Sequence, residues 1–215
     1  MEHKPIIHVR RSTERGHANH EWLNTYHTFS FGDYHDANHM SFRTLRVINE
    51  DTVAPGEGFG SHPHKDMEII TIVLAGALEH EDSIGNSSVI KVGDVQRMSA
   101  GRGVIHSEFN HSTKESVHFY QVWIFPEEKG VEPSYEQKSF PKNDLINHLC
   151  LIVSDNGVSN SLKIQQDVKV YQSILDTGKV LNYETDQRRG IWIQVHSGQL
   201  KITDEVSLTQ GDGAS

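Results

Sequence analysis

The chain has 215 residues, a formal net charge of −9 with histidine neutral, and 35% aliphatic and aromatic residues. That length and composition suit one large or two small domains with ordinary apolar cores. The acidic balance argues against direct binding of nucleic acid, which needs a basic face. No apolar run approaches the ~20 residues that a membrane-spanning helix needs.

Short β-strands dominate the first half of the chain. Alternating or continuous runs of β-branched and aromatic residues predict strands at residues 6–11, 43–49, 68–74, 76–82, 89–94 and 117–124. Residues 15–36 are polar, rich in histidine and aromatic residues, and show little periodicity, so they predict a loop plus a short strand. Residues 83–86 predict the hairpin turn that follows 76–82.

The second half repeats this pattern in weaker form after a break. Three prolines, a glycine and a run of charges lie between residues 126 and 141 and predict a connector. We therefore expect an N-terminal domain at 1–127, a connector at 128–141 and a C-terminal domain at 142–215. Strands are predicted in this last part at 149–154, 164–171 and 190–198, and the last of them parallels 68–76.

The C-terminal domain is expected to lack both a metal site and its last strands. The four residues before 190–198 are D-Q-R-R, with no pair of histidines. Gly93-Asp94 is followed by at least two strands, whereas the corresponding Gly211-Asp212 is followed by only three residues. We therefore expect a barrel that is incomplete at its end, with an open edge, and that is structural or faces a partner.

The single cysteine, Cys150, excludes an internal disulfide. A chain without disulfides fits a reducing compartment, and the first residues lack the apolar stretch of a secretory signal. We therefore expect a cytoplasmic protein. Cys150 lies between two leucines, which favours an inert thiol in the core.

Two pairs of polar residues carry the strongest functional signal. His62 and His64 are spaced i, i+2, and so are His106 and Glu108. Side chains at this spacing point to the same face of a strand, so two neighbouring strands would aim three imidazoles and one carboxylate at one point. Such donors suit Fe(II), Mn, Co, Ni, Cu(II) or Zn. Four protein ligands leave room on a six-coordinate ion for a substrate oxygen or for O2.

Glycine-rich segments frame both pairs. G-E-G-F-G-S at 56–61 precedes the first pair and Glu68 follows it, while G-R-G-V-I at 101–105 precedes the second pair and Asn110 follows it. These segments resemble the two motifs of the cupins, a family of small β-barrels. The first motif matches fully, and the second has Ser99 in place of the family's proline.

A narrower resemblance covers the chain from about Ile6 to its last residues. H-T-F-S-F-G-D-Y at 27–34 resembles a signature of the pirins, and further similar segments lie at 46–51, 55–59, 67–71 and 96–101. Membership of that family implies an all-β fold of two jelly-roll-like cupin barrels in tandem, with metal only in the N-terminal barrel. The ligands that it implies are His62, His64, His106 and Glu108. One divalent ion per chain is expected, with Fe(II) first among the metals.

Three other polar residues leave alternatives open. Glu68 lies at an even spacing from His62 and His64, so on a regular strand it would share their face. It could be a ligand, a carboxylate that orients an imidazole, or a hydrogen-bonded barrel residue, and the resemblance favours the last two roles. His27 lies in the pirin signature and could serve in the pocket or beside a ligand. His80 is expected to be structural.

The resemblance leaves two classes of function. Some bacterial pirins resemble flavonol 2,4-dioxygenases (quercetinases, also called quercetin 2,3-dioxygenases), which open the flavonol ring with O2 and release carbon monoxide. In such an enzyme Glu108 would take the proton of the flavonol 3-hydroxyl. Other pirins resemble redox-sensing regulatory proteins that bind iron and a protein partner without catalysis. The same ligands serve both classes, and we expect the enzyme, acting on a small aromatic substrate such as a flavonol.

Overall fold

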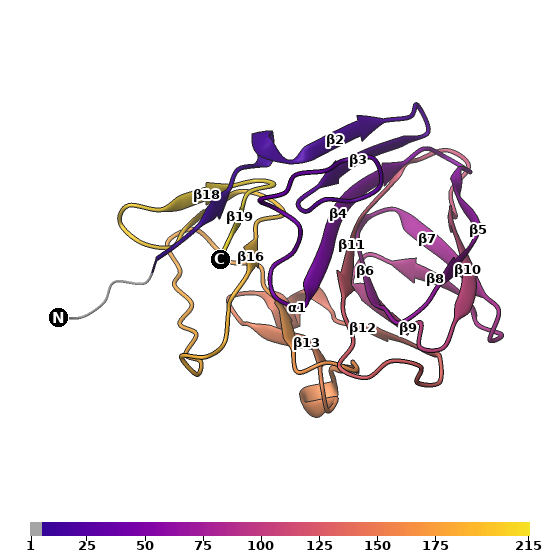
Figure 1. The fold of residues 1–215 in the computed structure, drawn as a ribbon. Coiled ribbons are helices and arrows are strands. Elements are labelled where there is room, and N and C mark those ends of the chain that lie inside the picture. Colours follow the sequence, from indigo (N-terminus) through magenta and orange to yellow (C-terminus); the bar gives the residue numbers. More distant parts are fainter. Residues whose placement is uncertain (1–5) are drawn as a thin grey trace.

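A computed structural model describes residues 6–215, and two β-sheets that face each other form its larger, N-terminal part (Figure 1). The seven-stranded sheet has the order β12 (Ser134–Ser139), β9 (Asp94–Ser99), β6 (Glu68–Ala75), β11 (Val117–Ile124), β4 (Leu45–Val53), β3 (Leu23–His27) and β2 (Gly16–Asn19). The four-stranded sheet has the order β5 (Gly58–His64), β10 (Val104–Asn110), β7 (Ala77–Asp82) and β8 (Ser87–Lys91). The all-β expectation is confirmed, because the described helical segments are only α1 (Lys142–Leu145) and two 3₁₀ turns at Ser12–Glu14 and Val158–Asn160. No helix among the described residues is long and apolar enough to cross a membrane.

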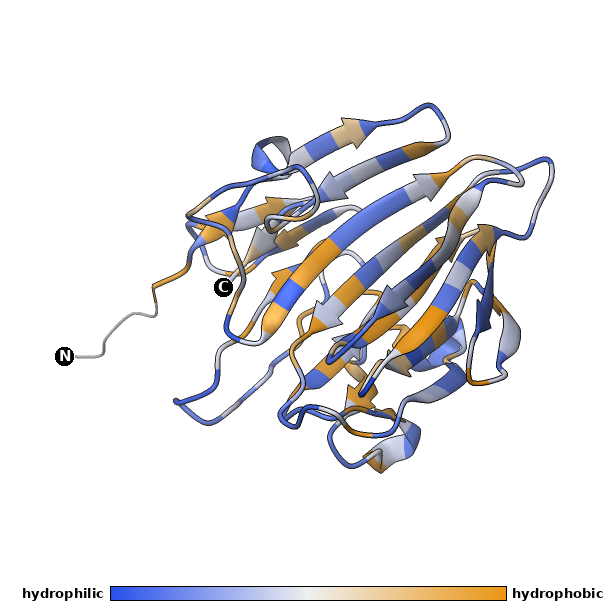
Figure 2. Cartoon of the chain, turned by 45° about the vertical axis from the view of Figure 1, so that its right-hand side comes forward, coloured by the Kyte–Doolittle hydropathy of each residue, from blue (hydrophilic) through white to orange (hydrophobic). Residues whose placement is uncertain are grey.

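Strand β6 carries apolar residues on both of its faces because both faces are buried. Ile69 packs inside the N-terminal barrel with Met98 and Val104. Ile70 points to the other side, where it joins a core cluster with Ile152 of the C-terminal half. A strand covered on both faces carries apolar residues without alternation. Figure 2 shows the resulting hydrophobic bands along the central strands.

The C-terminal half consists of shorter strands in three small sheets. The first contains β14 (Leu162–Lys163), β13 (Cys150–Ser154) and β15 (Lys169–Gln172), the second β1 (Val9–Arg10), β19 (Gly213–Ala214) and β16 (Ile193–Gln194), and the third β17 (Gln199–Lys201) and β18 (Ser207–Thr209). Val195, Leu208 and Ala214 form a core cluster of their own in this half. Ile152 and Leu162 instead share a cluster with Ile70, so the first sheet packs against the N-terminal barrel.

Two strands lie elsewhere than the sequence predicts. Residues 134–139 of the predicted connector form β12, which pairs with β9 at the edge of the N-terminal sheet. Strand β1 pairs with β19 near the other end of the chain, so residues 9–10 belong to a sheet of the C-terminal half. The division at 1–127, 128–141 and 142–215 stays a prediction, and these two strands depart from it.

The predicted strand at 190–198 is wrong in extent. Only Ile193–Gln194 of the predicted 190–198 forms a strand, because its hydrogen-bonding partner β19 is equally short. Strand β19 lies between β1 and β16, and the backbones of Ser215 and His8 exchange two hydrogen bonds of 2.8 and 2.9 Å. The last strand is therefore paired on both sides, in contrast to the open edge that the sequence predicts there.

Candidate metal centre

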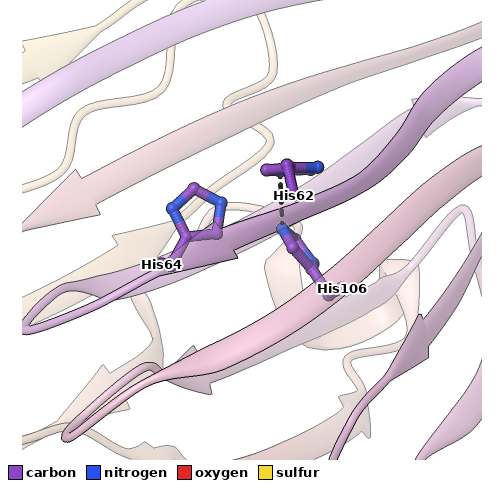
Figure 3. A group of neighbouring side chains, drawn as sticks. All are labelled: His62, His64 and His106. Atoms are coloured by element: carbon purple, nitrogen blue, oxygen red, sulfur yellow. Dashed lines mark hydrogen bonds between the residues drawn. The ribbon is translucent and has the colours of Figure 1, made fainter.

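Strands β5 and β10 run antiparallel, and their register places His106 directly opposite His62. His62 and His64 project from β5, and His106 points toward them from β10 (Figure 3). One ring nitrogen of each histidine lies within 4.8 Å of the other two. The structure thus brings together three of the four predicted metal-binding residues.

Hydrogen bonding leaves the Nε2 atom of His62 available as a ligand. His62 Nδ1 lies 2.7 Å from the carbonyl oxygen of Gly60. Because a carbonyl oxygen only accepts, Nδ1 carries the ring proton and Nε2 carries a lone pair. His62 Nε2 lies 2.9 Å from His106 Nε2. Two nitrogens bound at about 2.1 Å to one ion at a right angle would be about 3 Å apart, so this spacing fits a shared ion.

Burial keeps two of the imidazoles neutral. Burial first, and then the neighbouring His62, lowers the pKa of His64 to about 4. Burial and the surrounding histidines lower the pKa of His106 to about 2. Neutral imidazole is the form that binds metal. The donor chemistry of this site therefore fits a divalent transition metal.

Aromatic side chains border the three histidines. The ring of Trp123 on β11 lies edge-on to His64, with centroids 4.9 Å apart, and Phe31 lies edge-on to Trp123 at 5.2 Å. His27 lies 5.4 Å from Phe31 and its Nδ1 is hydrogen-bonded to Asn49 at 2.8 Å. Among the described residues, His27 belongs to neither cluster of potential metal ligands. It is therefore a residue of the aromatic wall, which we define as Phe31, Trp123 and His27.

Glu108 is enclosed in the interior of the barrel. Gln121 Nε2 donates a hydrogen bond to its Oε2 at 2.7 Å, and Thr71 Oγ1 lies 3.5 Å from its Oε1. Burial, aided by the nearby charge of Asp51, raises the pKa of Glu108 to about 7. This carboxylate is thus held by neutral donors, and no cation among the described side chains offsets its burial.

The ligand role of Glu108 stays a prediction. The pairing of β5 with β10 shifts between His106 and Glu108, so that Glu108 lies opposite Phe59. Such a shift marks an extra residue in one strand, which re-aims the side chains around it. The carboxylate of Glu108 lies within 4.8 Å of ring nitrogens of His106 and His80, in a second cluster that shares His106 with the cluster of three histidines.

Glu68 faces away from these histidines. Its Oε2 accepts hydrogen bonds from Ser99 Oγ at 2.8 Å and from the backbone N–H of Gln165, in the C-terminal half, at 3.2 Å. The side chain is fully buried, and burial raises its pKa. Of the three roles that the sequence left open, the structure supports the hydrogen-bonded barrel residue.

His80 lies against the site, although the sequence predicts only a structural role. It is fully buried, with Nδ1 3.4 Å from His106 Nδ1 and Nε2 3.1 Å from Asp82 Oδ2. The register of β7 and β10 places Asp82 opposite His106 and His80 opposite Glu108. The signal in the sequence is the i, i+2 spacing of His80 and Asp82, which is the spacing of the two predicted ligand pairs.

Comparison with known proteins identifies both halves of the chain. The family model described as Pirin matches residues 8–124, and the one described as Quercetinase C-terminal cupin domain matches residues 151–215. A curated protein of Escherichia coli (strain K12), named Quercetin 2,3-dioxygenase, is 46% identical over 208 residues, which are 97% of this chain and 88% of that protein.

Two crystal structures of an Escherichia coli protein are similar over the same extent. The structure of YhhW has a TM-score of 0.90 and 46% identity, and the match covers 97% of this chain and 88% of that one. The structure of bacterial pirin YhhW in complex with nickel(II) has a TM-score of 0.86 and 44% identity, covering 97% and 89%. These matches confirm the pirin resemblance and the cupin fold, and the names of the relatives support a metal-dependent cupin dioxygenase.

Proposed function

The chain belongs to the pirin family, and we propose that it is a metal-dependent dioxygenase that opens a flavonol ring with O2 and releases carbon monoxide. The observation that carries the proposal is the convergence of three imidazoles, from His62, His64 and His106, beside the aromatic wall. A divalent transition metal bound there would supply Lewis acidity toward an enol oxygen and electron transfer with O2.

We expect one Fe(II) per chain, held by the three histidines and Glu108. Imidazole and carboxylate donors also suit Mn, Co, Ni, Cu and Zn, and a similar protein was crystallised with nickel(II). Within residues 6–215, neither cluster of potential ligands includes a residue of the C-terminal half. This supports a single site in the N-terminal barrel.

The aromatic wall favours a planar aromatic substrate. Trp123 lies beside His64 and Phe31 extends the wall beyond it. Both rings are half-buried, as are His62 and His64. Pairing between aromatic rings contributes about 0.5–1.5 kcal/mol beyond the area buried, so a polyphenol gains affinity from lying against this wall.

Glu108 is the carboxylate best placed to accept a proton from the substrate. Its Oε2 is engaged by Gln121 at 2.7 Å, whereas its Oε1 has only the 3.5 Å contact with Thr71. We therefore assign Oε1 as the atom that takes the proton of a flavonol 3-hydroxyl, as a general base does.

The cytoplasm is the proposed compartment. Cys150 is the single cysteine of the chain and is free, which fits a reducing environment. The same environment keeps iron in the Fe(II) state that the proposal requires.

The test uses metal-free protein that is loaded anaerobically with Fe(II) and then mixed with quercetin in air. We expect carbon monoxide to appear in step with quercetin loss, and no turnover by the chelated protein. The variant His62→Ala should also be inactive, because it lacks the Nε2 that faces His106. The matched control is His111→Ala, since His111 is an exposed histidine, paired with Glu79, that belongs to neither ligand cluster.

A different result would favour the other function class. A metal-loaded protein that leaves quercetin unchanged in air, and that binds a protein partner in only one oxidation state of its iron, would contradict the dioxygenase. It would indicate the redox-sensing regulatory protein instead.

A further inference from the structure

A buried histidine connects the metal-facing ring of His106 to a carboxylate. His106 Nδ1 lies 3.4 Å from His80 Nδ1, and His80 Nε2 lies 3.1 Å from Asp82 Oδ2. All three side chains are excluded from solvent. The paired strands β10 and β7 hold them together, with His106 directly opposite Asp82. The three groups form a continuous hydrogen-bonding chain that ends at the carboxylate.

The carboxylate determines where each ring proton lies. An ionised carboxylate only accepts, so His80 donates from Nε2 and keeps a lone pair on Nδ1. That lone pair accepts a hydrogen bond from His106 Nδ1, which lies 3.4 Å away. His106 is then protonated at Nδ1 and presents an unprotonated Nε2 toward His62. An unprotonated Nε2 is what metal ligation by His106 requires.

Asp82 and His80 are each held in place by further contacts. Asp82 Oδ1 accepts the backbone N–H groups of Ile84 and Asn86 at 3.0 and 2.9 Å, and Asn86 Nδ2 donates to Asp82 Oδ2 at 2.9 Å. The ring of His80 stacks on Tyr135, with centroids 4.9 Å apart. Tyr135 belongs to β12, so a strand inside the predicted connector contacts His80.

We propose that His80 and Asp82 are positioning residues that hold His106 as the Nδ1-protonated tautomer, with Nε2 directed at the metal. This inference rests on the proposed metal site and adds to it a second layer of residues, which touch the ligand rather than the ion. Loss of such an orienting partner typically weakens metal binding by roughly 10- to 100-fold.

The same buried histidine offers a competing role. His80, His106 and Glu108 place one donor atom each within 4.8 Å of one another, so they form a second cluster that could hold an ion. If both clusters were occupied, His106 would have to give up both ring protons and bridge two ions. The orienting role keeps His106 neutral and uses the contact with Asp82 that the structure shows, so the observations favour it.

The test compares two substitutions of His80 in zinc(II)-loaded protein. Phenylalanine keeps a ring that stacks on Tyr135 but accepts no hydrogen bond, whereas glutamine can accept from His106 and donate to Asp82. Chelator competition should show zinc binding weakened by roughly 10- to 100-fold in His80→Phe and largely restored in His80→Gln. The control His111→Ala removes a histidine that is paired with an exposed carboxylate on the same sheet, and it should bind zinc as the parent protein does.

The tautomer itself gives a readout that damage to packing would not imitate. Nitrogen-15 NMR of the zinc-loaded parent protein should find the protons on His106 Nδ1 and His80 Nε2, protected from exchange with water. A proton on His80 Nδ1 in the parent protein would overturn the proposal whether or not any variant folds. In folded His80→Phe, the His106 Nδ1 proton should exchange rapidly.

The remaining outcomes separate this inference from the proposed metal site. Unchanged zinc affinity in His80→Phe, with loss of zinc in His62→Ala, would overturn only the orienting role. Two zinc ions per chain, falling to one in His80→Phe, would replace it with a second metal site. Full zinc binding by His62→Ala would overturn the metal site on which the inference rests.

Discussion

Glu68 is a buried carboxylate on the side of β6 away from the histidines, and two substitutions test its role. Its Oε2 accepts hydrogen bonds from Ser99 and from the backbone of Gln165, whereas its buried Oε1 has no partner among the described residues. Glu68→Ala leaves both donors unpaired. At about 1–3 kcal/mol for each buried unsatisfied group, it should lower the free energy of unfolding by about 2–6 kcal/mol. Glu68→Gln keeps the acceptor and should change that free energy by no more than about 1 kcal/mol.

The difference in unfolding free energy between Glu68→Gln and the parent protein should depend on pH, with a sign that follows from the pKa of Glu68. Burial is the main cause that raises the pKa of Glu68 above its ordinary 4.5. The carboxyl group therefore stabilises the fold below that ordinary value, and this contribution is lost as the pH rises through the higher pKa of the folded state. Glutamine resembles the protonated form and does not titrate. The stability of Glu68→Gln relative to the parent protein should thus increase with pH.

Urea unfolding of the metal-free proteins, followed by tryptophan fluorescence, measures both effects. Chelator competition on the folded variants measures their affinity for metal. We expect that affinity to be unchanged in Glu68→Gln, because Glu68 contacts Gln165 rather than the histidines. A loss of affinity of about tenfold or more, the size expected for a residue that supports a metal ligand, would refute this placement.

Three further outcomes follow from the geometry of the site. Glu108→Gln should lower metal occupancy far more than Glu68→Gln, as measured by elemental analysis after dialysis, and equal losses would indicate that both carboxylates bind. The loaded parent protein should contain about one ion per chain, because both clusters of potential ligands include His106 and a neutral imidazole has only one nitrogen free to bind an ion. Two ions per chain would contradict a single site. Metal binding should weaken as the pH falls through about 6 to 5, because the site requires neutral imidazoles and an ordinary histidine titrates near about 6.5. Full retention of metal at about pH 4 would argue against a three-histidine site.

The i, i+2 spacing within one strand correctly predicted that His62 and His64 share a face, whereas even spacing failed for Glu68, which lies beyond a turn on another strand. His62 and His64 share a face because they lie on one strand, and β5 pairs with β10 so that His106 meets them. Asp66 then adopts a positive φ of 50°, and the chain leaves β5 for β6 in the other sheet. The even spacing of His64 and Glu68 in the sequence therefore says nothing about the faces on which their side chains lie.

The prolines near residue 130 predict a connector, but two of them lie at the ends of a strand. Pro133 and Pro141 flank β12, where a missing backbone donor costs least. Strand β12 is an edge strand whose residues are mostly half-exposed, so it lacks the apolar alternation of the central strands. Its register with β9 is a long-range property, and the contact between Tyr135 and His80 depends on it.

The seven-stranded sheet links the site to the C-terminal half, which contributes no residue to either cluster of potential ligands among the described residues. On the inner face of β6, Thr71 contacts Glu108, while on the outer face Ile70 packs in a cluster with Ile152 of the C-terminal half. Because these side chains alternate along one strand, any movement of β6 that relaxes the outer packing also displaces Thr71. Loss of the C-terminal half would expose Ile70 and remove one of the two hydrogen bonds to Glu68. The C-terminal half therefore contributes to the site by packing against β6, the strand that carries Thr71 beside Glu108.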